Sequence, residues 1–436
     1  MIIAQRLIVI SLDAMGSRDL DEHLDELPNL RRLVVTGTRV RQVRGIYPTL
    51  TYPSHTTIIT GQYPREHGIV NNTKLQPQRK SPDWYWYQRD VQVPTLYDLV
   101  RQQHQKTAAF LWPVTAGSKI TYNLAEIFPN RIWTNQVLVS LKASSPAFLL
   151  RMNQKYGHLR RGIQQPELDD FITACAVDTI THKKPQLTLI HLVDMDSMRH
   201  RYGVRSDEAM AALRRLDTRV GELIDATIAA GTFAETNFAV LGDHYQINVD
   251  RMIHLNQAFA DRGWLTPTPE GTVKPDWHVL AKSCDGCTYV YTRNFADTQN
   301  LKQLMLDTAG VVSVIDGRAA AKRGADPHCQ FMVEAAEGYY FTDETNRPSV
   351  VEPVDPASLG TPDRYHGVHG YDPDKPDYFT TLVLSGPAIK GGHTIDHAEL
   401  VDEAPTFAHL LGVQFPEPLP GHALTDALKG DTNEVQ

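Results

Sequence analysis

Short apolar runs alternate with helical patterns along most of this chain. Spacing at threes and fours predicts amphipathic helices over Pro28–Thr36, which Gly37 ends, and over Asp207–Ala230. The alternation predicts an α/β fold, doubly wound, with a mostly parallel sheet and helices on both faces. Five apolar runs have the length and composition of its strands: Arg6–Leu12, Lys106–Leu111, Gln186–Val193, Asn237–Leu241 and Tyr378–Ser385.

The pattern changes between residues 245 and 365. Apolar segments at Cys287–Tyr291, Val311–Ile315 and Gln330–Ala335, with a helical pattern over Thr298–Asp307, predict a β-α-β-β element. We therefore expect a core domain made of residues 1–244 and 366–436, with residues 245–365 inserted as a small α+β cap subdomain. Loops between Leu75 and Pro166 are expected to face the substrate.

Composition restricts the partners and the compartment. A 436-residue chain with 42% hydrophobic residues can bury a large core, and its net charge of -8 gives no field that attracts nucleic acid or anionic membranes. An anionic substrate would therefore need local cationic groups, and the oligomeric state is not encoded. The N-terminal apolar stretch is too short and too polar for a signal peptide or a membrane span. Four cysteines fit a reducing compartment, which predicts a cytoplasmic protein.

Acidic residues follow three of the predicted strands. Asp13 follows the first strand, and Asp194 and Asp196 follow the run that ends at Val193. Asp243 and His244 come after the run that ends at Leu241. Parallel strands deliver such residues to one edge of the sheet. Close carboxylates repel, by about 4 kcal/mol per pair at ~4 Å and an effective dielectric constant of ~20. Cations are therefore expected between them.

Histidines complete a candidate metal centre. Asp196 and His200 are four residues apart, which places both side chains on one face of a helical turn, and His369 offers a second imidazole. Mixed Asp and His ligands suit zinc, with manganese or iron as alternatives.

Hydroxyl groups cluster in the stretch YPTLTYPSHTT, just before a helix expected to begin near Ser54. Taken alone, this cluster fits a capped helix entrance, since Ser and Thr are favoured there. It also fits a nucleophile placed where backbone N–H groups receive an anion. The local sequence leaves both interpretations open.

The ordered motifs SLDAM, PTLTYPSHTTIITGQYPREHGIVNN, DMDSMRHRYG, GDHYQ and HGVHGYDP resemble the nucleotide pyrophosphatase/phosphodiesterase family of the alkaline phosphatase superfamily. The resemblance spans nearly the whole chain and implies an alkaline phosphatase-like fold that binds two divalent metal ions. Transferred motif by motif, one metal is expected at Asp13, Thr51, Asp243 and His244. The other is expected at Asp196, His200 and His369.

The resemblance also implies the reaction and the partner, a small phosphorylated substrate that is a phosphodiester or nucleotide-like. Thr51 matches the family's nucleophile and Asn72 its phosphate-binding asparagine, so we expect attack of Thr51 on phosphorus and hydrolysis of a phosphothreonine. Two divalent ions against three aspartates and the Thr51 alkoxide leave the site near neutral, which suits a monoanionic diester. Tyr52 stands where alkaline phosphatases place an arginine that holds extra charge.

Two alternatives use the same residues. A phosphonoacetate hydrolase-like enzyme would cleave a P–C bond at a similar site, and a catalytically silent relative would only bind a phosphorylated ligand. Sulfatase activity is disfavoured because Thr51 stands where a sulfatase needs a Cys or Ser.

Several nearby residues have a plainer interpretation. His55 and His67 are expected to make supporting hydrogen bonds rather than bind metal. His366 competes with His369, which is favoured by its HGY context, and Asp194 competes with Asp196. Cys284 and Cys287 form a C-x-x-C pair without a second pair nearby, so ordinary thiols are favoured over redox or zinc chemistry.

Overall fold

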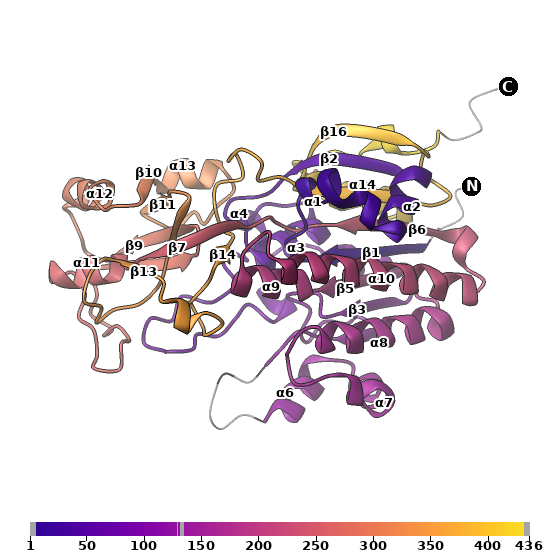
Figure 1. Ribbon diagram of the computed structural model, residues 1–436, viewed down its shortest axis with the longest axis horizontal. Helices are drawn as coiled ribbons and strands as arrows, with labels where there is room; N and C mark the ends of the chain where they lie inside the picture. Colours follow the sequence, from indigo (N-terminus) through magenta and orange to yellow (C-terminus); the bar gives the residue numbers. More distant parts are fainter. Residues whose placement is uncertain (1–5, 129, 131–134, 431–436) are drawn as a thin grey trace.

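A computed structural model describes residues 6–128, 130 and 135–430. Its largest element is an eight-stranded sheet, in which β1 pairs in parallel with both β5 and β6 (Figure 1). Only β15 runs antiparallel to its neighbours, so the sheet is mostly parallel, as predicted. Across the sheet the strands are β16 (His393–Glu399), β2 (Thr38–Arg44), β15 (Thr380–Ser385), β6 (Thr236–Leu241), β1 (Arg6–Leu12), β5 (Leu187–Leu192), β3 (Thr107–Phe110) and β4 (Tyr122–Leu124).

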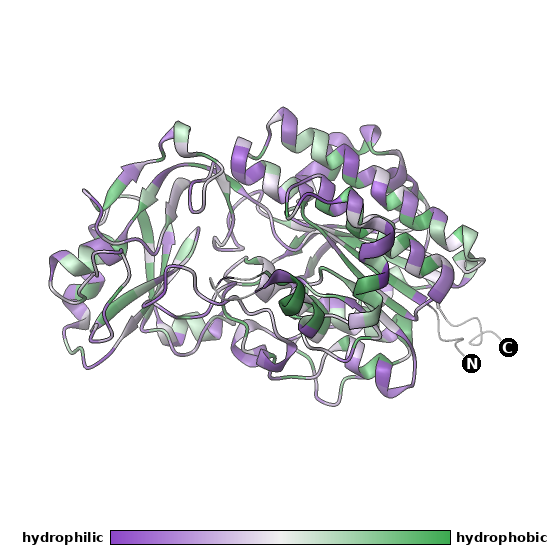
Figure 2. Ribbon diagram, turned by 90° about the horizontal axis from the view of Figure 1, so that it is seen from below, coloured by the Kyte–Doolittle hydropathy of each residue, from purple (hydrophilic) through white to green (hydrophobic). Residues whose placement is uncertain are grey.

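Helices cover both faces of this sheet, and Figure 2 shows the strands between them as its hydrophobic interior. One face carries α2 (Pro28–Thr36), α8 (Glu167–Lys183) and α10 (Asp207–Ala229). The other face carries α3 (Thr51–Thr60), α5 (Leu96–Gln102) and α14 (Glu403–Leu411). The remaining helices of this part are α1 (Ser17–His23), α4 (Pro64–His67), α6 (Gln136–Ala143), α7 (Pro146–Tyr156) and α9 (Asp194–Tyr202).

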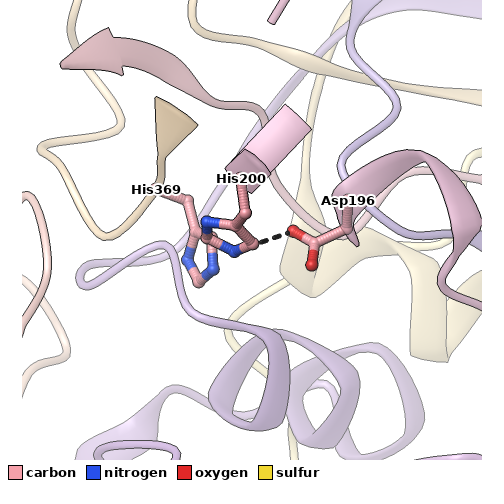
Figure 3. Close-up of side chains that lie close together, drawn as sticks. All are labelled: Asp196, His200 and His369. Atoms are coloured by element: carbon pink, nitrogen blue, oxygen red, sulfur yellow. Dashed lines mark ion pairs between the residues drawn. The ribbon is translucent and has the colours of Figure 1, made fainter. Parts of the chain in front are cut away.

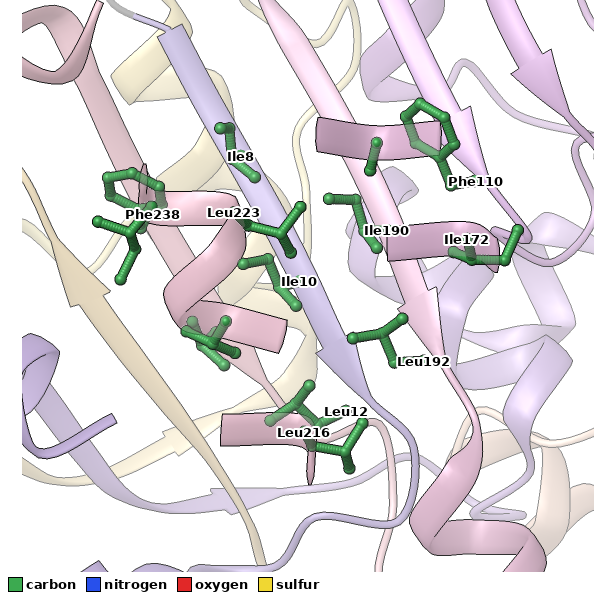
Figure 4. Packing of buried hydrophobic residues seen from close by; sticks show 14 of the residues in the cluster. Ile8, Ile10, Leu12, Phe110, Ile172, Ile190, Leu192, Leu216, Leu223 and Phe238 are labelled. Atoms are coloured by element: carbon green, nitrogen blue, oxygen red, sulfur yellow. The ribbon is translucent and has the colours of Figure 1, made fainter. Parts of the chain in front are cut away.

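The side chains of β1 point alternately to the two faces of the sheet, which explains why helices cover both faces. Ile8, Ile10 and Leu12 point toward α10, where they pack against Leu216 and Leu223 (Figure 4). The intervening Leu7 and Val9 belong to the cluster on the opposite face. A strand that is apolar on both faces needs a helix layer on each side, which is the physical basis of the three-layer arrangement.

A second lobe follows β6 in sequence and lies beside the sheet in Figure 1. It contains a four-stranded antiparallel sheet in the order β10-β11-β9-β8 and a smaller sheet around β7. The strands and helix of the predicted β-α-β-β element are present as β9, α12, β10 and β11, but a short helix that was not predicted, α13, separates β10 from β11. Its predicted limits, residues 245 and 365, stay a prediction. The lobe's elements are β7 (Ile247–Ile253), α11 (Leu255–Asp261), β8 (Val279–Cys284), β9 (Cys287–Thr292), α12 (Thr298–Leu306), β10 (Val311–Asp316), α13 (Gly317–Lys322), β11 (Phe331–Ala335), β12 (Gly338–Phe341), β13 (Val351–Pro353) and β14 (Gly367–Val368).

The start of α3 differs from the sequence prediction. The helix begins at Thr51 rather than near Ser54, because Pro53 lies in the first turn, where its missing N–H is not needed. Leu50 is the N-cap and provides no side-chain cap, while the hydroxyls of Thr56 and Thr60 donate to carbonyls four residues earlier. The hydroxyl cluster is therefore not a capping arrangement.

The substitution Leu216→Ala should lower the free energy of unfolding by about 2–5 kcal/mol, because it leaves a cavity between α10 and β1. Ile228→Ala on the same helix is the control. Because Ile228 is 51% exposed, this substitution should lower the free energy of unfolding by less than about 0.5 kcal/mol. Urea unfolding measures both values. Equal losses would contradict the packing described for α10.

Candidate metal and phosphate site

Three strand ends bring acidic residues to one edge of the sheet. Asp13 directly follows β1, and its N–H donates to the carbonyl of Leu192 at the end of β5. Asp243 lies two residues beyond β6 and accepts a hydrogen bond from the N–H of Ala14. Gly242 permits this approach, because a Cβ there would lie 1.9 Å from the carbonyl oxygen of Met15. Asp196 lies in the first turn of α9, after β5.

His244 is the point where the first group of side chains converges. Its Nε2 lies 3.0 Å from Thr51 Oγ1 and 3.3 Å from a carboxylate oxygen of both Asp13 and Asp243. All four residues are buried. Asp13 Oδ1, Asp243 Oδ2 and His244 Nδ1 have no hydrogen-bond partner among the described residues. Buried carboxylate oxygens without donors are the kind of atom that a cation satisfies.

A second group contains Asp196, His200 and His369, whose ligand atoms all lie within 4.8 Å of one another (Figure 3). His200 Nδ1 donates to the carbonyl of Gly367 at 2.7 Å, and His369 Nδ1 donates to that of Thr49 at 3.0 Å. These bonds use Nδ1 of each ring, so Nε2 is the atom that remains for a ligand, and His200 Nε2 lies 3.3 Å from Asp196 Oδ1. Asp196 also groups with Asp13 and His244, so its carboxylate lies between the two clusters.

Asn72 lies beside Thr51. Its Oδ1 accepts the N–H of Tyr52 at 2.9 Å, and its amide NH₂ makes no hydrogen bond with any described residue. Asn72 and Thr51 both line a cavity of about 250 Å³ that also contains Asp13, Asp196 and His369. The NH₂ group is therefore available to an anion bound in this cavity.

Charge dominates the energetics of the site. Burial, followed by the charge of Asp196, raises the pKa of Asp13 well above its usual value, and burial with the charge of Asp13 does the same to Asp243. Burial lowers the pKa of His369 to about 4. Although burial acts against both charged forms, the pairing of His200 with Asp196 at 3.3 Å raises the pKa of His200 to about 9 and lowers that of Asp196.

Among the competing candidates, His55 lies close to the first group, with its Nδ1 3.4 Å from Asp243 Oδ2. His366 is exposed, while His369 is buried beside His200. Asp194 is fully buried and forms ion pairs with Arg215 and Arg219, which gives it a structural role. His55 hydrogen bonds to Ser11 and to the carbonyl of Thr51, in keeping with a supporting role.

The HGY context of His369 has a structural cause. Gly370 has φ +86, and a Cβ at that position would lie 1.7 Å from the carbonyl oxygen of Cys284. Only glycine allows His369 to approach the β8–β9 turn so closely. Cys284 and Cys287 face each other across that turn, and all four cysteines are buried and unpaired.

Two residues of the site were missed in the sequence. His191 in β5 places Nε2 2.9 Å from Asp13 Oδ2, and Glu126 lines the same cavity with its Oε2 3.8 Å from His191 Nδ1. Burial raises the pKa of Glu126. The available signal was a polar residue inside or just after an otherwise apolar strand, in LTLIHLV and in YNLAEIF.

The fold and the clustered acidic and histidine residues define the class of metal-dependent, alkaline phosphatase-like hydrolases. A model of the family "Type I phosphodiesterase / nucleotide pyrophosphatase" matches residues 7–372. The chain belongs to this family, so the resemblance and the fold class inferred from the sequence are confirmed.

The similar proteins cover different shares of the chain. Bis(5′-adenosyl)-triphosphatase ENPP4 of Bos taurus is 22% identical over 94% of this chain and 78% of its own length. Ectonucleotide pyrophosphatase/phosphodiesterase family member 1 of Homo sapiens is 26% identical over 58% of this chain, which spans only 25% of that longer protein.

A solved structure of murine ectonucleotide pyrophosphatase/phosphodiesterase 5, an inactive threonine-to-alanine variant in complex with AMP, superposes with a TM-score of 0.71. It shows 18% identity over 98% of this chain and 100% of that chain. At this identity the likeness establishes the fold. Within the described parts of the chain, no helix has both the length and the apolar character needed to cross a membrane.

The substitution Asp13→Asn should stabilise the metal-free protein at pH 8. A raised pKa in the folded state means that Asp13 favours folding at low pH, and that this contribution is lost as the pH rises and the buried carboxyl ionises. The amide removes that charge and keeps an acceptor for His191, so the free energy of unfolding should rise, by on the order of 1–4 kcal/mol.

Asp194→Asn is the matched control, because its buried carboxylate is already paired with arginines. Its free energy of unfolding should fall by about 3–5 kcal/mol under the same conditions. Urea unfolding in the presence of a chelator measures both. Destabilisation by Asp13→Asn at pH 8 would contradict the electrostatic description of the site.

Proposed function

We propose that this protein is a two-metal phosphodiesterase or nucleotide pyrophosphatase that acts through a phosphothreonine at Thr51. The observation that carries the proposal is the convergence of Thr51, Asp13 and Asp243 within 3.3 Å of His244 Nε2. A threonine hydroxyl is a weak nucleophile near neutral pH and needs activation. Membership of the family supports the bond type, an ester or anhydride of phosphoric acid.

Two divalent ions fit the donor atoms of the site. Asp13, Asp243, His244 and Thr51 would hold one ion, and Asp196, His200 and His369 the other. Carboxylate and imidazole donors suit zinc, with manganese or iron as alternatives. When bound, the ions supply Lewis acidity that favours the alkoxide of Thr51 and neutralises charge on the phosphoryl oxygens.

The protein's own groups orient the reaction. Thr51 is the first residue of α3, so an attacked phosphate lies at the positive end of the helix. The Asn72 NH₂ is placed to donate to a phosphoryl oxygen, where charge develops during attack. The substrate loses an alcohol or a nucleoside phosphate, and water then cleaves the phosphothreonine.

The charge balance favours a diester over a monoester. Two divalent ions offset Asp13, Asp196, Asp243 and the Thr51 alkoxide, which leaves no surplus for a phosphate dianion. Tyr52, next to the nucleophile, is buried and uncharged. P–C hydrolysis would use the same residues, and product analysis on phosphonoacetate separates it from diester cleavage. The intact nucleophile disfavours a silent binding protein. We keep a cytoplasmic, reducing location as part of the proposal, supported by four unpaired cysteines.

The substitution Thr51→Ala should lower kcat for bis(4-nitrophenyl) phosphate by at least about 10³-fold, because it removes the nucleophile. Thr51→Ser should keep part of the activity. Thr60→Ala, at the other end of the same helix, controls for loss of a buried hydroxyl and should keep most of it. Steady-state kinetics on metal-loaded protein decide the point, and near-normal turnover by Thr51→Ala would exclude the mechanism.

The substitution Asn72→Ala should lower kcat about 10²–10³-fold, the range found for a lost donor to a developing oxyanion. Its metal content, measured by mass spectrometry, should stay unchanged because Asn72 is not among the proposed ligands. Asn71→Ala is the neighbouring control, because the Asn71 amide donates to the Ser283 carbonyl and to Cys284 Sγ. Unaltered kcat in Asn72→Ala would remove the residue from the phosphate site.

A further inference from the structure

A second cavity, of about 590 Å³, lies between the loop of residues 73–84 and the second lobe. Six residues line both this lobe cavity and the proposed catalytic cavity: Thr73, Trp84, Lys282, Asp343, Asp363 and Tyr365. The two cavities therefore open into each other. The volume of the lobe cavity suits a bound small molecule, since such sites measure about 300–1,000 Å³.

The leaving group of the proposed reaction points toward this lobe cavity. In a phosphoryl transfer the attacking and leaving oxygens lie roughly in line across the phosphorus atom. Thr51 contacts His244 on one side of the catalytic cavity, so the leaving oxygen departs on the side of His200 and His369. The ring of Tyr365 lies 4.6 Å from the ring of His200, and Tyr365 also lines the lobe cavity. A group attached to the leaving oxygen therefore extends into the lobe cavity.

The wall of the lobe cavity is close to neutral. Four basic and four acidic side chains line it, and three of the basic ones already form ion pairs with neighbouring carboxylates. Most of the other polar residues of the wall carry hydroxyl or amide groups, as in Gln76, Asn256, Thr272 and Thr345. Such a wall suits an uncharged ligand that forms hydrogen bonds.

The passage between the two cavities disfavours a phosphorylated leaving group. Asp285 lines the catalytic cavity, and Asp343 and Asp363 line both cavities. Lys282 is the one basic side chain among the described residues of the shared wall, and it is paired with Asp343. A chain of phosphates would meet these carboxylates without a free cation.

Three side chains at this passage keep their polar atoms for a ligand. The hydrogen bonds that Thr73, Asp363 and Tyr365 form with described residues use their backbone atoms. The hydroxyls of Thr73 and Tyr365 and the carboxylate of Asp363 are therefore available, the first two as donors and the third as an acceptor. Thr73 also pairs with Trp84 across an isolated β-bridge, so an indole ring lies next to these groups. This combination suits a sugar ring, whose C–H face packs on an aromatic ring while its hydroxyls form hydrogen bonds.

We propose that the lobe cavity binds the leaving alcohol of the substrate, and that this alcohol is an uncharged, hydroxyl-rich group, a sugar or another polyol. The proposal rests on the proposed diesterase function and narrows it to diesters of such alcohols. As Thr51 Oγ1 bonds to phosphorus, the bond between phosphorus and the sugar oxygen breaks, and the released alkoxide takes a proton from water. The phosphoryl group stays on Thr51 while the alcohol leaves through the lobe cavity.

The test compares two methyl phosphodiesters whose leaving groups share one ring and one CH₂–O linkage. One leaving group is methyl α-D-glucopyranoside, esterified at its 6-oxygen, and the other is tetrahydropyran-2-methanol, which lacks the ring hydroxyls. A bound hydroxyl contributes about two- to tenfold, so the three hydroxyls should raise kcat/KM by at least about tenfold for the sugar ester. Release of methyl phosphate from metal-loaded protein, followed by phosphorus NMR, gives both values. Equal values, or release of methanol instead of the sugar, would overturn the proposal.

Two variants locate the sugar. Asp363→Ala removes the available carboxylate and should lower the preference for the sugar ester about tenfold, because hydrogen bonds to charged groups are the stronger ones. Thr73→Val removes the available hydroxyl at nearly constant shape and should lower the preference at least about twofold. Asp276→Ala is the matched control, since Asp276 is an exposed carboxylate of the second lobe, as Asp363 is, but lies outside both cavities. A preference that survives both substitutions, or that falls equally in Asp276→Ala, would overturn this placement.

A binding measurement separates this proposal from the proposed function. Isothermal titration calorimetry of the two diesters with metal-loaded Thr51→Ala protein needs no turnover. Binding of the sugar ester that is at least about tenfold tighter, and that weakens when Asp363→Ala is added, supports the site even if the unsubstituted protein cleaves neither diester. Equal binding of the two diesters overturns it even if both are cleaved.

Discussion

Repulsion between buried carboxylates is the constraint on which the site depends. Asp13, Asp196 and Asp243 are all buried, and the charge of one raises the pKa of another. The protein neutralises a neighbouring buried carboxylate, Asp194, with two arginines, yet within the part of the chain that the structure describes no arginine or lysine forms an ion pair with these three. A fold that holds such a cluster with histidines but no arginine or lysine paired to it is suited to cations from solution. The parallel sheet causes the repulsion between these carboxylates, because it brings the ends of their strands close together.

The surrounding structure aims the histidines at the same point. Backbone carbonyls of Gly367 and Thr49 bind the Nδ1 atoms of His200 and His369, so that each ring presents Nε2 to Asp196. The second lobe takes part in this arrangement, since its β8–β9 turn donates from Gly286 to the His369 carbonyl. Both lobes therefore determine the position of His369.

The sequence predicted the elements whose patterns are local. The bounds of β1 and α2 match the prediction, because a doubly buried strand and an amphipathic helix ended by Gly37 are strong signals. β2 was missed, since TRVRQVR carries three arginines among its strand residues. The antiparallel direction of β15 depends on where its long connections lead, and no local pattern records that.

The candidate site was predictable because its residues follow strands or stand in ordered motifs. The seven proposed ligands form the two groups described above, one around His244 and one that contains Asp196, His200 and His369. The preference for His369 over His366 agrees with the burial of His369 and the exposure of His366. His191 and Glu126 escaped notice because their role depends on contact across the sheet rather than on spacing.

The most direct test of the central claim is a crystal structure of zinc-soaked protein with anomalous data collected at the zinc edge. The account predicts two strong anomalous peaks, one contacted by Asp13, Asp243, His244 and Thr51 and one by Asp196, His200 and His369. A single peak, or peaks away from these residues, would contradict it.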